Sequence, residues 1–126
     1  MKDSVAAAAA ERFQLQWTPT IVILDTGGRE VHRIEGFLPN DDFLAQLRIG
    51  LGQVAMSAKR FTDAEREFHQ VVEELPNTDA APEAQYWRGV SKYKGSNDPA
   101  ALKETAEAFR KRYSDSTWAK KASIWN

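Results

Sequence analysis

The chain has 126 residues, of which 42% are hydrophobic and 28% are charged, and its formal net charge is −1. This composition is that of a globular protein of one domain or two very small ones, and it excludes a fibrous or disordered chain. Because the sequence contains no cysteine, the chain by itself offers no disulfide, no thiolate nucleophile and no cysteine ligand for zinc.

The N-terminal third predicts a helix followed by a β-hairpin. An alanine-rich segment ending near Phe13 favours a helix. The apolar run over residues 21–24 is typical of a strand that is covered on both faces. The mixed segment 29–37 predicts a second strand, and Gly27 and Gly28 between the two are typical of a tight hairpin turn.

The first of these strands lacks a second neighbour in the sequence. A lone hairpin is only marginally stable in water, and so apolar a strand normally lies between two others. We therefore expect the missing neighbour to come from polypeptide upstream of this chain, in which case Met1 is not the natural start, or from a second copy. A homo-oligomer would then form through Ile21, Val22, Ile23 and Leu24.

The remaining sequence predicts five helices, over residues 41–57, 62–75, 79–94, 99–113 and 117–126. Asn40 is the expected cap of the first helix, and Thr62 with Glu65 the expected capping box of the second. Asp98 followed by Pro99 is typical of the start of the fourth. The apolar stripe expected on the first helix consists of Phe43, Leu44, Leu47 and Leu51.

The helical region also repeats itself. Residues 64–78 resemble residues 102–116 in the spacing of their apolar positions, at an offset of 38 residues. The same offset places Ala84 over Ala122 and Trp87 over Trp125. A period in this range is typical of stacked helical hairpins.

Residues 13–51 resemble the second half of a thioredoxin-fold domain. The resemblance rests on a loop with Thr18, Pro19 and Thr20, a hydrophobic strand, a glycine-rich turn and a second strand ending at Gly36 and Phe37. It implies that Pro19 is a cis-proline and that the backbone of Thr18 pairs with an extended peptide. The peptide-binding residues implied are Trp17, Thr18, Pro19 and Phe37. The family's Cys-x-x-Cys half has no counterpart here.

Residues 45–126 resemble tetratricopeptide repeats (TPR). Gly52, Ala64, Phe68 and Pro76 match the family's spacing in a first unit, and Gly89 opens a second with an extra residue near position 95. The fold class expected is α+β and mostly helical, with a partial thioredoxin-like segment over residues 1–52 and TPR-like helical repeats over residues 45–126 that share helix 41–57. The resemblance points to a bacterial cytoplasmic or periplasmic protein.

No residue pattern predicts a catalytic centre. His32 and His69 lie far apart without metal-ligand spacing, no serine has a recognisable base, and the glycines form no phosphate loop. We therefore expect no catalytic residue, no metal, no cofactor and no enzymatic activity from this chain alone. Neither a nucleic-acid partner nor a membrane span is expected.

The aromatic residues of the helices offer the candidate site. Most recur at helical spacing and should pack between hairpins, but the chain ends on an apolar segment where a helical stack needs a polar cap. Glu83 and the other acids of the early helices are expected to lie on solvated faces. The predicted interaction surface consists of Tyr86, Trp87, Tyr93, Trp118 and Trp125.

The function predicted from these features is that of a non-catalytic module that binds a peptide or partner protein. Two alternatives stay open. One is the C-terminal portion of a thiol–disulfide oxidoreductase whose Cys-x-x-Cys half is missing from this chain. The other is a self-associating assembly subunit.

Overall fold

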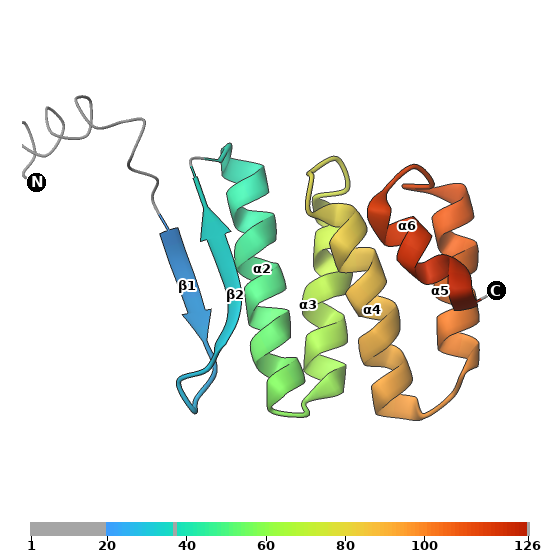
Figure 1. The fold of residues 1–126 in the computed structure, drawn as a ribbon, viewed down its shortest axis with the longest axis horizontal. Coiled ribbons are helices and arrows are strands. Elements are labelled where there is room, and N and C mark those ends of the chain that lie inside the picture. The colour runs from blue at the N-terminus through green and yellow to red at the C-terminus, as the bar shows by residue number, and fades with distance from the viewer. Residues whose placement is uncertain (1–19, 37, 126) are drawn as a thin grey trace, which may run out of the picture.

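The computed structural model describes residues 20–36 and 38–125. Within them a β-hairpin and four helices lie side by side in chain order, consecutive helices run antiparallel, and a short last helix packs on the two before it (Figure 1). The fold is therefore α+β and mostly helical, as the sequence predicts. The elements are β1 (Thr20–Leu24), β2 (Glu30–Glu35), α2 (Asn40–Ser57), α3 (Phe61–Glu74), α4 (Ala81–Ser96), α5 (Ala100–Lys111), α6 (Thr117–Ala122) and a 3₁₀ turn, Ser123–Trp125.

The hairpin forms where the turn residues predict it. β1 pairs antiparallel with β2, with Ile23 opposite His32. The Oδ1 atom of Asp25 accepts hydrogen bonds from the backbone N–H of Gly27, at 2.9 Å, and of Arg29, at 3.0 Å. Gly28 has a φ of 85°, which a residue with a side chain adopts only at a cost.

The expectation that β1 is covered on both faces is wrong for the described residues. Ile23 contacts the backbone of α2 at Gly50, so one face of the hairpin packs on that helix. On the open face the side chains of Val22 and Leu24 are 40% and 52% exposed. The reason is that the described part of the chain supplies β1 with one neighbour, β2, and with no layer on the far side.

Two of the three predicted helix caps differ from the structure. α2 begins at Asn40 itself, so the asparagine lies inside the first turn and makes no capping hydrogen bond. α3 begins at Phe61, which likewise places Thr62 within the helix, and no capping box forms. In both cases the residue chosen as the cap lies within the helix and not before it.

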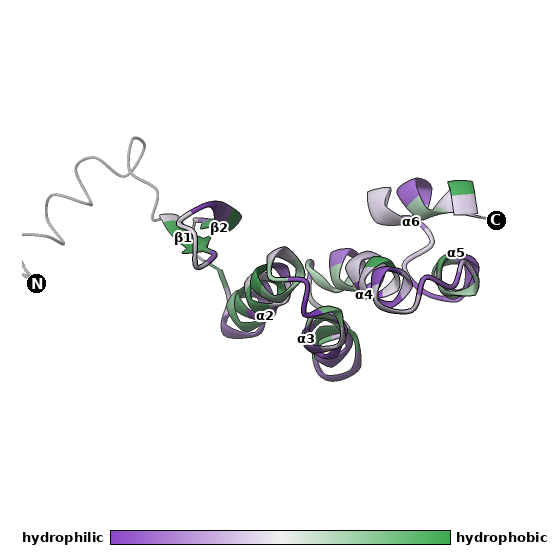
Figure 2. Cartoon of the chain, turned by 90° about the horizontal axis from the view of Figure 1, so that it is seen from below, coloured by the Kyte–Doolittle hydropathy of each residue, from purple (hydrophilic) through white to green (hydrophobic). Residues whose placement is uncertain are grey.

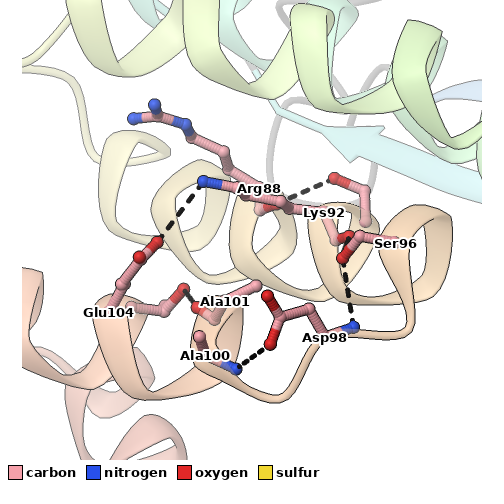
Figure 3. A network of polar contacts seen from close by, with 9 residues as sticks. Arg88, Lys92, Ser96, Asp98, Ala100, Ala101 and Glu104 are labelled. Atoms are coloured by element: carbon pink, nitrogen blue, oxygen red, sulfur yellow. Dashed lines mark hydrogen bonds and ion pairs between the residues drawn. The ribbon is translucent and has the colours of Figure 1, made fainter.

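At the third predicted cap Asp98 does accept a hydrogen bond from the start of α5, although the helix begins at Ala100 and not at Pro99. The backbone N–H of Ala100 donates to Oδ1 of Asp98 at 3.0 Å, in the turn from α4 to α5 (Figure 3). Ser96 supports the same turn, because its Oγ accepts from the backbone N–H of Asp98 at 3.2 Å. Asn97 ends α4 in the left-handed conformation, with a φ of 58°, which asparagine tolerates better than most residues.

The apolar stripe predicted for α2 is wrong. Leu44 and Leu51 are 41% and 53% exposed. The buried side of the helix consists instead of small residues and one isoleucine, because α2 is flanked by the hairpin on one side and by α3 on the other. Close approach on both sides requires side chains that take little room. The buried residues of α2 are Ala45, Ile49, Gly50, Gly52 and Ala55.

The core of the molecule lies between α2, α3 and α4 and is centred on Phe68, which is fully buried. A Cβ atom on Gly52 would lie 2.9 Å from Cδ1 of Phe68 and closer still to the ring edge, so the glycine makes room for the ring. Gly89 on α4 approaches Thr105 on α5 in the same way, where a Cβ atom would lie 2.7 Å from the threonine Cβ.

These two contacts refine the register of the repeat. Phe68 follows Gly52 by 16 residues, and Thr105 follows Gly89 by the same number. The buried positions of α3 therefore align with those of α5 at an offset of 37, without the extra residue predicted near position 95. From α4 to α6 the predicted offset of 38 fits, because Ala84 and Ala122 are both fully buried.

Candidate interaction surface

Four aromatic side chains from the C-terminal half of the chain gather in one place. Tyr86 stacks on Trp125 with 5.0 Å between ring centroids and an interplanar angle of 21°. Tyr86 also meets Trp87 edge to face at 5.3 Å and Trp118 at 5.2 Å, and Trp87 lies 6.4 Å from Trp118. We call Tyr86, Trp87, Trp118 and Trp125 the aromatic face. All four are partly exposed.

Local structure explains why these residues meet. Tyr86 and Trp87 follow one another on α4, and Trp87 packs against the central core. α6 is capped by Ser116, whose Oγ accepts from the backbone N–H of Ala119 at 3.0 Å, and Ala122 anchors it to the core. The 3₁₀ turn then carries Trp125 back over Tyr86. Seen along the helices, the hairpin and α6 stand on the same side of α2 and α4, and α3 lies on the other (Figure 2).

The structure does not bring every predicted site residue to this face. Tyr93 lies about 10 Å further along α4, two helical turns beyond Tyr86, and none of the ring contacts among the described residues involves it. The predicted peptide-binding residues Trp17, Thr18, Pro19 and Phe37 lie outside the described residues. The cis-proline therefore stays a prediction.

A carboxylate lies beside the aromatic face. Glu83 is on α4, one turn before Trp87, and burial raises the pKa of its carboxyl group above the ordinary value. The charge of His32, the contact with the Trp87 indole and the charge of Lys121 act in the opposite direction but do not offset the burial. The expectation that Glu83 lies on a solvated face is wrong, because the residue is partly buried on α4, against which α6 packs.

Two further polar groups complete the surroundings of Glu83. His32 of β2 forms a hydrogen bond from Nε2 to Oε1 of Gln46 on α2, at 2.7 Å. The Nζ of Lys121 lies 4.1 Å from the ring centroid of Trp118, in a cation–π arrangement. The indole N–H of Trp87 is buried without a hydrogen bond of ordinary geometry, although the Glu83 carboxylate is close enough to interact with it.

Sequence reasoning missed Glu83, Lys121 and His32 as members of this surface. Part of the signal was present, because Glu83, Tyr86 and Trp87 are spaced as i, i+3 and i+4 and so share one helix face. The rest required the tertiary fold. His32 and Lys121 come from elements far away in the sequence, and no local pattern links them to α4.

The raised pKa of Glu83 makes a prediction about stability. The folded state holds this proton more tightly than the unfolded state, so folding stability rises as the pH falls through the raised pKa and is lost as the pH rises again. Near pH 7 the ionised carboxylate therefore destabilises the fold. We expect Glu83→Gln to raise the melting temperature near pH 7 by about 2–4 °C, and the gain to vanish near the ordinary glutamate pKa of about 4.3.

Circular dichroism melts over a range of pH measure this difference. Glu107→Gln is the matched control, because Glu107 lies exposed on α5 and its removal should leave the melting temperature unchanged at every pH. Equal effects of the two substitutions would show that Glu83 is solvated after all.

Other charged residues link neighbouring helices. Arg48 of α2 lies 3.6 Å from Glu67 and 4.0 Å from Glu74, both on α3. Lys92 of α4 reaches Glu104 of α5 at 3.3 Å (Figure 3). Pairs as exposed as Lys92 and Glu104 contribute less than about 1 kcal/mol each. These charges therefore support the helical row and do not form a separate site.

The described residues show no other chemical centre. No three of their histidine, aspartate and glutamate side chains are placed so that they could hold a metal ion. In the same part of the chain no helix combines the length and the apolar character that crossing a bilayer requires.

The geometry thus defines an α+β protein in which a β-hairpin is followed by a row of antiparallel helices that ends in an aromatic surface. Comparison with known families adds one finding, a match of residues 2–50 to the family model of the thioredoxin-like domain. The N-terminal portion of the chain is therefore thioredoxin-like. The match includes the hairpin and the first part of α2 and ends before α3. No curated protein and no solved structure matches the chain.

Proposed function

We propose that this chain is a non-catalytic protein–protein interaction module, in which a thioredoxin-like N-terminal portion is joined to TPR-like helical hairpins. The observation that carries the proposal is the aromatic face, where four partly exposed rings from α4, α6 and the last turn meet. Partly exposed tryptophan and tyrosine held in fixed geometry are the side chains that contribute most to protein interfaces.

The TPR-like part of the proposal is supported by the repeated packing of the hairpins. Gly52 contacts Phe68 and Gly89 contacts Thr105, and both pairs have the same sequence spacing. Because each glycine has no side chain, the neighbouring helix can approach it closely. In this arrangement α2, α4 and α6 are the first helices of successive hairpins. The aromatic face lies on α4 and α6, so it belongs to the surface that first helices share.

Peptide selection tests the proposal. Random linear peptides displayed on phage are selected against the chain, and the affinities of the enriched peptides are measured by tryptophan fluorescence. Trp118→Ala and Trp125→Ala should each weaken binding by about thirtyfold, the effect of removing an interface hot spot. Leu51→Ala, which shortens an apolar side chain exposed outside the aromatic face, should leave binding unchanged.

Two results would contradict the proposal. One is that no peptide is enriched, or that the tryptophan variants bind as the original chain does while circular dichroism shows them folded. The other is that the chain alone reduces insulin disulfides efficiently, which would make it a catalyst.

A second candidate function, self-association as an assembly subunit, is favoured by the open face of β1. Val22 and Leu24 are exposed there, and β1 has a free side in the described sheet, so a strand of a second copy could extend it. Light scattering at high concentration should then show a dimer, and Val22→Lys should convert it to a monomer. A monomer at every concentration would exclude this candidate.

A further inference from the structure

We propose that the aromatic face and Glu83 together form a binding site for a basic side chain, lysine or arginine, of a partner polypeptide. This inference deepens the proposed function and rests on it, because it states which chemistry the docked segment must carry. Three features of this surface support it: the Glu83 carboxylate, the aromatic rings and the lysine that lies over one of them.

The first feature is the carboxylate of Glu83, which lacks an ion pair. No lysine, arginine or histidine among the described residues forms a salt bridge with its carboxylate, although Glu83 is partly buried. His32 and Lys121 act on Glu83 only through longer-range electrostatic interaction. A partly buried carboxylate without an ion pair costs free energy that a directly bonded cation would recover.

The second feature is the group of neighbouring rings, which favours a positive charge. Trp87 lies one turn from Glu83, and Tyr86 and Trp118 lie against Trp87. The face of an aromatic ring attracts cations, most strongly in tryptophan and most effectively where water is excluded. A cationic side chain between Glu83 and these rings would therefore gain an ion pair and a cation–π contact together. An acidic side chain would be repelled both by the Glu83 carboxylate and by the faces of the rings.

The third feature is a cation of the chain itself that already lies on this surface. Nζ of Lys121 lies over the ring of Trp118 and also interacts with Glu83. Lys121 is an exposed side chain near the end of α6, so an incoming lysine or arginine can displace it. Lys121 thus occupies the position proposed for the basic side chain of the ligand and competes with that side chain.

Opposite effects of two substitutions test this inference. The probes are capped peptides with one fixed background and a central arginine, lysine, norleucine or glutamate, and their binding is measured by tryptophan fluorescence near pH 7. We expect the two basic peptides to bind about tenfold or more tightly than the norleucine peptide. Glu83→Gln should abolish this preference while the melting temperature rises, and Lys121→Ala should strengthen binding of the basic peptides.

Each substitution has a matched control in the chain. Glu107→Gln removes an exposed glutamate on α5, and Lys120→Ala removes the exposed lysine next to Lys121, so neither should change the preference. The combined gain in stability and loss of binding in Glu83→Gln excludes a folding defect as the cause.

The outcomes separate this inference from the proposed function. Peptides that bind equally well with norleucine, or better with glutamate, would overturn the basic site but leave the interaction module standing, and so would a Glu83→Gln variant that keeps the preference. Failure of every peptide to bind would overturn both. Weaker binding of the basic peptides to Lys121→Ala would also contradict the role given to Lys121.

Discussion

Replacing Phe68 with alanine is expected to lower the free energy of unfolding by about 3–5 kcal/mol. Phe68 is the largest of the fully buried side chains and lies in the core between α2, α3 and α4. Its removal leaves a cavity that rigid helices on both sides cannot close. Urea denaturation followed by circular dichroism measures the loss, and a typical domain has about 5–15 kcal/mol in total.

Phe61→Ala is the matched control for this prediction. Phe61 begins α3 and is only partly buried, so its truncation should cost clearly less than that of Phe68. If the two variants had equal stability, the core would not be centred on the contact between α2 and α3, and the helical row would need another explanation.

Gly52→Ala is expected to destabilise the fold by about 1–3 kcal/mol, although alanine is the better helix former. The added Cβ atom would enter the ring of Phe68, which is fully buried and cannot move aside. Gly50→Ala is the contrasting case on the same helix, because its Cβ atom would meet the terminal carbon of Ile23, a flexible side chain on the hairpin. We expect that variant to retain nearly full stability.

A double-mutant cycle isolates the contact that Gly52→Ala disturbs. In a Phe68→Leu background the smaller side chain leaves room for the new methyl group, so the cost of Gly52→Ala should fall sharply and the two changes should not be additive. Additive effects would show that Gly52 is required for some reason other than the close approach of α3.

Much of the fold follows from local signals in the sequence. Gly27 and Gly28 mark the hairpin turn, Asp98 marks the start of α5, and the described helices lie within a few residues of the predicted ranges, except that the last stretch ends in a 3₁₀ turn. These features depend on residues close together in the chain. Turn and cap chemistry acts over a few residues, so a single sequence can reveal it.

The parts that could not be predicted depend on what packs against a segment. On α2 the apolar stripe was predicted from the large leucines. The residues that are actually buried between the hairpin and α3 are small ones such as Ala45 and Gly52. At the candidate site the position of Glu83 on one face with Tyr86 and Trp87 is visible in the sequence. Its partial burial is not, because it depends on how other elements, α6 among them, pack around α4.

The exposure of β1 likewise depends on what packs against the strand. Its sequence correctly indicates a strand that favours burial, yet the described residues offer it a single neighbour and leave Val22 and Leu24 open. A local pattern indicates that a strand favours burial, but it does not indicate which neighbour covers the strand.

The proposed function requires that a partner polypeptide binds on the aromatic face. Nuclear magnetic resonance of the four tryptophan indole N–H groups, recorded while a selected peptide is added, tests it most directly. We predict that the resonances of Trp87, Trp118 and Trp125 shift together and that the backbone amides of β1 do not. Shifts confined to the amides of residues 20–24, with the three indole signals unchanged, would contradict the claim.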